Sequence, residues 1–165
     1  MRGKAIKYNE MNINTDLIIP ARYLVDSDPK FLAAHCMEDL DPDFNAKVKK
    51  EDISIIVANS NFGSGSSREQ APLAIKTAGI QCVLAPSFAR IFFRNAINIG
   101  LPIIEFKEIE QINTGDELEI DFENGKIVNL TTHEDFIITK MPEFLQEIIA
   151  SEGLVNYAKK IIARN

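Results

Sequence analysis

The chain has 165 residues, of which 45% are hydrophobic and 25% are charged, and its formal net charge is −6. This length and composition predict a globular protein with a real core and a single domain spanning residues 1–165. The negative charge disfavours nucleic-acid binding as a main task, because contacts to phosphates need a basic face.

The sequence carries no sign of export or membrane insertion. Its N-terminus, MRGKAIKYNE, lacks the apolar stretch of a signal peptide, and no apolar run approaches the length of a membrane span. The two cysteines, Cys36 and Cys82, form no close pair for a metal or a disulfide framework, and they are too few for an iron–sulfur cluster. We therefore expect a cytoplasmic chain that contacts no membrane and binds no cofactor itself.

The first third of the chain gives only short predicted elements. Residues 16–21 form an apolar run, which Pro20 prevents from continuing far as a strand. Residues 31–40 have the spacing of a short helix, which ends at the Asp-Pro-Asp sequence that follows. Residues 47–52 are charged, so we expect them on the surface.

The middle of the chain alternates between strand and helix patterns. Predicted buried strands occupy residues 53–58, 81–85 and 101–104, and predicted helices between them occupy residues 68–77 and 87–99. Ser87 is a candidate N-cap for the second helix, and Gly79 and Gly100 end the two helices. This order predicts a parallel sheet with right-handed crossovers.

The C-terminal part changes to a hairpin pattern followed by helix. Asn124-Gly125 is a strong turn signal between predicted strands at 117–121 and 126–130, and a further strand is expected at 136–139. Pro142 opens a final helical segment, interrupted near Gly153, that is predicted to pack through its apolar residues Phe144, Leu145, Ile148 and Ile149. The whole pattern predicts an α/β fold, with a mixed sheet whose parallel strand–helix–strand core is flanked by helices.

One loop, NSNFGSGSSRE at residues 59–69, has the composition of an anion site. It follows a predicted strand and precedes a helix, where unpaired amides and the helix dipole favour negative charge. Gly63 and Gly65 allow a tight turn and a close approach to a ligand, and Arg68 offers a planar fork for a carboxylate. The glycine patterns of nucleotide loops are absent, so we expect a carboxylate rather than a phosphate.

The serines of this loop also fit a purely structural role. Ser66 with Glu69 and Ser67 with Gln70 each make a capping box, and only one of the two can cap the helix. If Ser67 caps, Ser66 stays free, and Pro72 falls at the fifth helical position, where its missing N–H breaks a bond. Capping serines are commoner than catalytic ones, so both interpretations remain open.

Four segments, in the same order along the chain, resemble the swivelling domain of the aconitase superfamily. They are NTDLIIP at 14–20, NFGSGSSRE at 61–69, SFARIF at 87–92 and GLP at 100–102. A stand-alone chain of this length is similar to the small subunits of the isopropylmalate dehydratase type. The resemblance implies a single swivelling β/β/α domain.

The resemblance also implies a reaction, a partner and a set of site residues. It implies a hydro-lyase of leucine biosynthesis that isomerises 2-isopropylmalate and 3-isopropylmalate through a dehydrated intermediate. A large catalytic subunit would carry a 4Fe-4S cluster and would pair with this chain around a small dicarboxylic hydroxy acid. Ser66 matches the serine base and Asp16 an active-site aspartate, whereas Ser67 and Arg68 match residues that bind the substrate carboxylate, which Gly65 lets the loop approach. By spacing alone, a turn or capping role for Asp16 is favoured, and only the resemblance raises the catalytic role above it.

Val25 bears on the choice of substrate. Relatives that act on tricarboxylates carry an arginine in this loop, whereas an apolar Val25 suits an isopropyl or methyl group and leaves a third carboxylate without a partner. Val25 also fits simple packing within its own loop, and the direction of Arg22 is open. Two alternatives therefore remain: the same chemistry on citramalate or homoaconitate-type substrates, and a non-catalytic anion-binding regulatory module.

Overall fold

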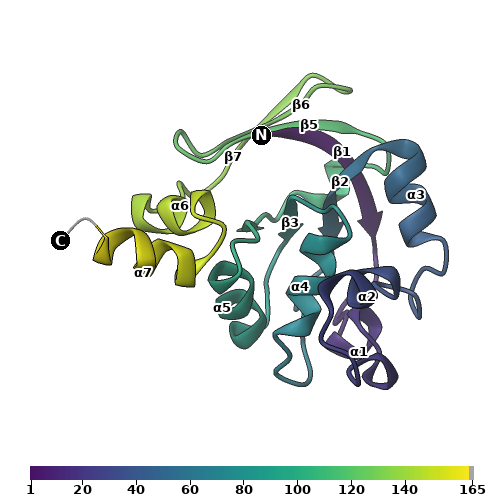
Figure 1. Ribbon diagram of the computed structural model, residues 1–165. Coiled ribbons are helices and arrows are strands. Elements are labelled where there is room, and N and C mark those ends of the chain that lie inside the picture. The colour runs from purple at the N-terminus through teal and green to yellow at the C-terminus, as the bar shows by residue number, and fades with distance from the viewer. Residues whose placement is uncertain (164–165) are drawn as a thin grey trace.

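Seven strands form one mixed sheet in the computed structural model, which describes residues 1–163 (Figure 1). The strands, in the order of the sheet, are β4 (Ile103–Glu105), β3 (Cys82–Ala85), β2 (Ile53–Ala58), β1 (Arg2–Tyr8), β5 (Glu117–Asp121), β6 (Lys126–Asn129) and β7 (Glu134–Ile137). Strands β4 to β1 run parallel and β5 to β7 are antiparallel. The predicted mixed sheet with a parallel core is therefore confirmed, although residues 164 and 165 of the predicted domain lie outside the described residues.

Helices occupy the connections between the parallel strands and the C-terminal end. They are α1 (Thr15–Ile18), α2 (Pro29–Ala34), α3 (Phe44–Glu51), α4 (Gln70–Thr77), α5 (Arg90–Asn98), α6 (Glu143–Ala150) and α7 (Leu154–Ile162), with 3-10 turns η1 (Ala21–Tyr23) and η2 (Ile109–Gln111). Among residues 1–163, none of the helices has the length and apolar character needed to cross a bilayer.

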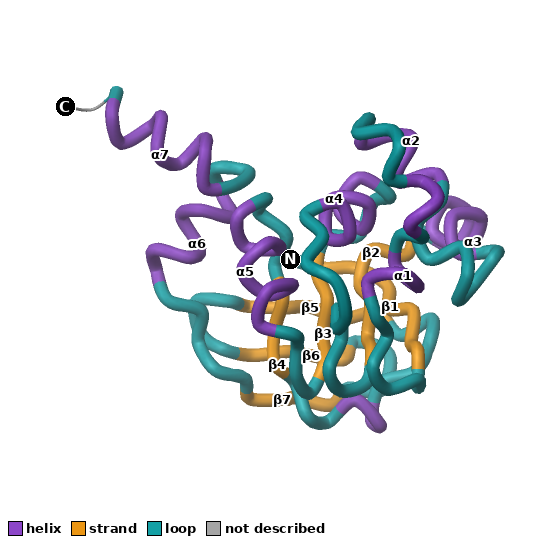
Figure 2. Tube along the Cα trace, turned by 90° about the horizontal axis from the view of Figure 1, so that it is seen from below, coloured by secondary structure: helices purple, strands orange, loops and turns teal. Residues whose placement is uncertain are grey.

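The sheet buries apolar side chains on both faces, because successive residues of a strand point to opposite sides. Ile56 and Val83 belong to the core that the helices cover. Ile55 and Leu84 belong to a second core, together with Leu118 of β5 and residues of β6 and β7. Phe106, directly after β4, and Phe136 of β7 belong to opposite ends of the sheet, yet their ring centroids lie 5.3 Å apart, so the sheet curls over itself, as Figures 1 and 2 show.

Three predictions for the first third of the chain are wrong in whole or in part, each for a local reason. The apolar run 16–21 begins as helix α1, because Asn14 caps that helix and its Oδ1 accepts from the Leu17 amide at 3.0 Å. The helix predicted over 31–40 ends at Ala34, and Met37 has a left-handed φ of 61° and bonds back to α1. The charged stretch 47–52 is not wholly exposed, because α3 buries Val48.

Three further details differ from the sequence prediction. Ser87 does not cap the helix that follows: its Oγ accepts from the Asn61 amide at 2.9 Å, and α5 begins only at Arg90. Phe144 does not pack against the core, since it is largely exposed, whereas Ile148 of the same helix is buried. Strand β7 begins and ends two residues before the predicted range.

Candidate functional site

The loop at residues 59–69 connects β2 to α4 at the carboxyl end of the parallel strands, as predicted (Figure 1). Neighbouring segments hold it on both sides. The Phe62 amide donates to the Ser87 carbonyl at 3.1 Å, and the Ala89 amide donates to the Phe62 carbonyl at 3.0 Å. On the other side, the Gly63 amide donates to the Ile13 carbonyl at 2.8 Å. The course of the loop is therefore set before α4 begins.

The start of α1 lies directly against the serines of the loop. Asn14 and Ser64 form an isolated parallel bridge, in which the Thr15 amide donates to the Ser64 carbonyl at 2.8 Å. The Thr15 hydroxyl donates to the Ser66 carbonyl at 3.0 Å. Thr15 was not among the residues that sequence analysis selected, and its position next to Asp16 in the segment NTDLIIP is the signal that would have found it.

Asp16 and Arg68 form an ion pair across this contact. Arg68 Nη1 lies 2.7 Å from Asp16 Oδ1 and donates a second bond, at 3.2 Å, to the Ile19 carbonyl. The Arg68 side chain is only 14% exposed, whereas that of Asp16 is 58% exposed. The other guanidinium nitrogens of Arg68 have no acceptor within residues 1–163. The helix-cap alternative for Asp16 is wrong, because Asn14 caps α1.

Neither Ser66 nor Ser67 caps a helix. Helix α4 begins at Gln70, and the residue before it, Glu69, makes no side-chain capping bond. Both capping-box interpretations are therefore wrong. Pro72 is the third residue of α4, in the first turn, where an amide has no partner within the helix, so the predicted loss of a bond does not arise.

Two serine hydroxyls and the last amides of the loop remain free for a ligand. Ser66 and Ser67 are exposed, and in the part of the chain that the structure describes neither hydroxyl has a hydrogen bond. The amides from Gly65 to Glu69 likewise donate to no acceptor within residues 1–163. Gly65 has a φ of 91°, a conformation that glycine adopts without steric cost. With the N-terminus of α4 behind them, these donors make an edge of positive potential that suits an anion.

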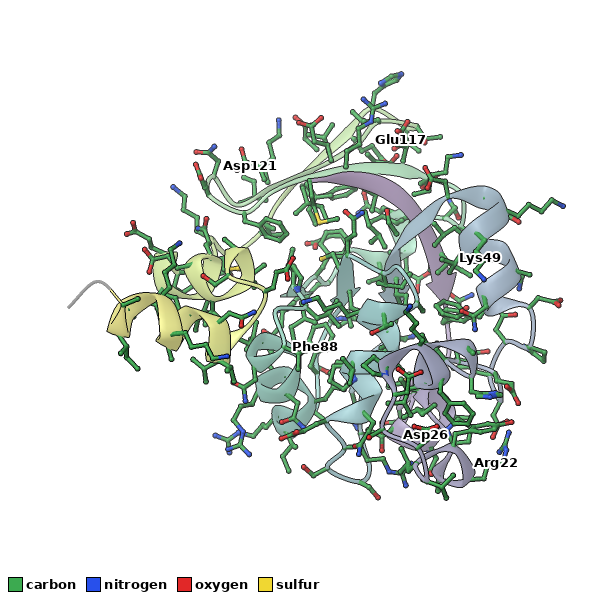
Figure 3. The ribbon with its side chains drawn as sticks, in the orientation of Figure 1. Arg22, Asp26, Lys49, Phe88, Glu117 and Asp121 are labelled. Atoms are coloured by element: carbon green, nitrogen blue, oxygen red, sulfur yellow. The ribbon has the colours of Figure 1, made fainter. Side chains whose placement is uncertain are left out.

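Val25 lies in the loop between η1 and α2, and its side chain is 89% exposed. The alternative in which it packs within its own loop is therefore wrong. Figure 3 labels the adjacent Asp26 together with Arg22 at one end of the molecule, the end that holds α1, with Glu117 and Asp121 at the opposite end.

Arg22 is held by an acidic neighbour. Its guanidinium bonds both oxygens of Asp39, at 2.8 and 2.5 Å, and it lies over the Tyr23 ring at 4.7 Å from the centroid. The hydrogen bond from Arg22 lowers the pKa of the Asp39 carboxyl. Arg22 is thus occupied within this chain.

The residues of this chain do not fit an iron–sulfur cluster. Cys36 and Cys82 are fully buried on opposite faces of the sheet, one in each core. Burial raises the pKa of both thiols, so neither offers the thiolate that iron needs. Across residues 1–163 there is no group of three or more side chains able to hold a metal ion.

Comparisons with known proteins show which proteins this chain resembles. Residues 30–109 match the family described as the aconitase C-terminal domain. The chain is 59% identical over 160 residues to a 3-isopropylmalate dehydratase small subunit from Clostridium beijerinckii, covering 96% of this chain and 98% of that protein. It is 56% identical over 157 residues to a 2,3-dimethylmalate dehydratase small subunit from Eubacterium barkeri, covering 94% of both. Among solved structures, 3-isopropylmalate dehydratase from Methanocaldococcus jannaschii superposes with a TM-score of 0.90 at 46% identity, covering 98% of this chain and 95% of that one.

Proposed function

The chain belongs to the family of 3-isopropylmalate dehydratase small subunits, and from this premise we propose that it works with a large subunit as a hydro-lyase of leucine biosynthesis. The substrates are 2-isopropylmalate and 3-isopropylmalate, which interconvert by loss of water and its addition at the neighbouring carbon. We further propose that the chain acts as one swivelling-type domain, which the single continuous sheet supports. Two buried free thiols fit a reducing, cytoplasmic compartment.

Ser66 is the proposed base. It removes the proton from the carbon next to a substrate carboxylate, and the electron pair left behind forms the carbon–carbon double bond as the neighbouring C–O bond breaks. Serine is a weak base unless its anion is stabilised. The single observation that carries the proposal is the Ser66 hydroxyl itself, which is exposed, unbonded within residues 1–163 and set among amides that have no acceptor there.

Arg68 and Ser67 are the proposed carboxylate ligands. One nitrogen of Arg68 is held by Asp16 and the Ile19 carbonyl, which leaves the rest of the planar fork for the substrate. Asp16 orients this fork and keeps the site close to neutral before an anion enters. Gly65, with no side chain, lets the substrate approach the backbone.

A large subunit is needed to complete this site. Ser66, Ser67 and Val25 are all exposed on this chain, and an alkoxide in contact with bulk water gains little from nearby dipoles. A partner that covers the loop would exclude water. The departing hydroxyl needs a Lewis acid, and we assign it to the 4Fe-4S cluster that the family resemblance places in the large subunit.

The choice of substrate within the class rests on Val25. Relatives named for 3-isopropylmalate and for 2,3-dimethylmalate have nearly equal identity to this chain, so overall similarity does not separate these substrates. Both are malates with an apolar branch. An exposed valine, with Arg22 bound to Asp39, offers such a branch an apolar contact and offers a third carboxylate nothing.

The test is Ser66→Ala in the complex with the large subunit. We expect kcat to fall by about 10²–10⁴-fold with little change in KM, which is the range for loss of a general base. The matched control is Ser64→Ala in the same loop, because the Ser64 hydroxyl points to the Asn12 carbonyl at 3.4 Å and should be dispensable. Unchanged turnover of Ser66→Ala would favour a non-catalytic anion-binding module.

A further inference from the structure

Thr15 makes two hydrogen bonds to the serine loop, and they reach two alternate carbonyls. Its amide donates to the Ser64 carbonyl at 2.8 Å, and its hydroxyl donates to the Ser66 carbonyl at 3.0 Å. The second bond spans 51 positions of the sequence. A buried threonine hydroxyl in a first helical turn ordinarily forms its hydrogen bond with a nearby backbone group. The long-range bond to the loop therefore indicates a role beyond local hydrogen bonding.

These two bonds fix the direction of two amides. In a trans peptide the C=O and N–H groups point in opposite directions, and no residue of 1–163 follows a cis bond. Because the carbonyls of Ser64 and Ser66 both face Thr15, the amides of Gly65 and Ser67 both point away from it, toward the same side of the loop. Neither amide has an acceptor in the part of the chain described by the structure.

We propose that Thr15 is a positioning residue: through its hydroxyl it sets the plane of the Ser66–Ser67 peptide, so that the Ser67 amide, paired with that of Gly65, faces the reacting anion. This inference rests on the proposed function of the loop. Two amides on one side of a loop form a donor pair for a substrate oxyanion or for the Ser66 alkoxide, and donors fixed in advance need no reorientation during the reaction.

The burial and stiffness of the Thr15 side chain suit it to this positioning role. It is 2% exposed, and its β-branched side chain is stiff about χ1. It is the first residue of α1, which the Asn14 side chain caps. Position 65 is a glycine, and a Cβ placed there would lie 3.5 Å from Thr15 Oγ1, so a side chain at this position would contact the hydroxyl.

The Arg68 side chain is held in place independently of Thr15. Arg68 is held by Asp16 and by the Ile19 carbonyl, and neither bond involves the Thr15 side chain. Loss of the Thr15 hydroxyl should therefore disturb the base and its amides while Arg68 stays in place. This separation predicts an effect on kcat rather than on KM.

The test compares Thr15→Val with Thr15→Ser in the complex with the large subunit, with 2-isopropylmalate as substrate. Valine keeps the shape and removes the hydroxyl, and we expect kcat to fall about 10–100-fold with KM within about threefold of wild type. Serine keeps the hydroxyl, and we expect kcat within about threefold of wild type. A kcat for Thr15→Val within twofold of wild type overturns the proposal, and so does a Thr15→Ser enzyme as slow as Thr15→Val, since packing would then be the cause.

A second measurement does not depend on turnover. In amide NMR spectra of the isotopically labelled full chain, Thr15→Val should shift the Gly65 and Ser67 resonances and Thr15→Ser should leave them near their wild-type positions. Unmoved resonances in Thr15→Val overturn the proposal. Thr15→Ala removes the same hydroxyl without placing a methyl group against the loop, and serves if the valine variant does not fold. A fully active Ser66→Ala would instead refute the proposal that Ser66 is the base. Shifted Gly65 and Ser67 resonances in Thr15→Val would still support the positioning role of Thr15.

Discussion

Asp16 Oδ1 and Arg68 Nη1 lie 2.7 Å apart, although 52 positions of sequence separate the two residues. The bond joins α1 to the loop before α4, and it is one of several that make these segments a single unit. Thr15 contributes two more, and the Ile13 carbonyl a further one. The proposed base and the proposed carboxylate ligand are thus held by neighbouring residues of the same short helix.

Replacing Arg68 by Lys should weaken substrate binding. A single ammonium cannot serve Asp16, the Ile19 carbonyl and a substrate carboxylate as the planar fork does. We expect KM to rise about 10–100-fold, the range for loss of a charged hydrogen bond, with a smaller effect on kcat. Steady-state kinetics of the complex measure this. Arg22→Lys is the control, since Arg22 lies at the same end of the molecule but is bound to Asp39; a similar rise in its KM would contradict the assignment.

Replacing Val25 by Arg should change the choice of substrate. The new guanidinium would remove the apolar contact for an alkyl branch and provide a partner for a third carboxylate. We expect kcat/KM for 2-isopropylmalate to fall about tenfold or more, and turnover of a homoaconitate-type tricarboxylate to become measurable. A substrate panel that includes citramalate checks this. The control is Val155→Arg, at an exposed valine on α7, which should leave the ratios of kcat/KM between substrates unchanged. Equal changes of these ratios in both variants would show that the added charge alone is responsible.

Sequence reasoning succeeded where local pattern and burial agree. The run 53–58 was predicted as a buried strand, and all six residues of β2 are buried. The Asn124-Gly125 turn was likewise placed correctly between β5 and β6. Strand β1, in contrast, was missed, because much of it is polar or partly exposed and its place is decided by pairing with β2 and β5 on either side.

The candidate site likewise combines features that local sequence predicts with features that depend on long-range contacts. The loop and its glycines were evident from the sequence, whereas the two capping boxes were false signals. Residues 63–66 are bound to residues 13–15, and helix α4 begins only at Gln70. No local pattern predicts that Asp16 meets Arg68, because the pair depends on how α1 folds back onto the loop. The resemblance to a known family assigned both residues to one active site but did not predict this contact.

Replacing Gly63 by Ala should destabilise the fold at the start of the loop. Its φ is 77°, and a Cβ at this position would lie 2.2 Å from Cγ of Phe92. The left-handed backbone and the overpacking together predict a loss of about 2–5 kcal/mol in the free energy of unfolding. Urea unfolding of the chain measures it. Gly115→Ala is the control, with a φ of 93° and no atom within 4 Å of the new Cβ, so it should lose only about 1–2 kcal/mol; equal losses would exclude the contact with Phe92.

Asp41 accepts hydrogen bonds from two side chains that lie far apart in sequence. The Tyr8 hydroxyl donates to Oδ2 at 2.9 Å, and Lys47 Nζ lies 2.7 and 2.8 Å from the two oxygens. Burial acts to raise the pKa of the Asp41 carboxyl, but the bonds from Lys47 and Tyr8 outweigh it, and the pKa lies below its usual value. Asp41 is 9% exposed, so these bonds form largely out of water.

Replacing Asp41 by Asn should therefore lower stability in a pH-dependent way. Because the pKa is lower in the folded chain than in the unfolded chain, the unfolded state takes up a proton first on acidification. The carboxylate's contribution is complete at neutral pH and is lost as the pH falls below about 4. We expect Asp41→Asn to lose about 1–3 kcal/mol in the free energy of unfolding at pH 7, and less at pH 3.5, in urea titrations.

The control is Asp43→Asn, at an exposed neighbouring carboxylate without an ion pair in residues 1–163, which should show neither the loss nor its pH dependence. A difference between wild type and Asp41→Asn that stays constant from pH 7 to pH 3.5 would mean that the stabilisation comes from shape and not from charge.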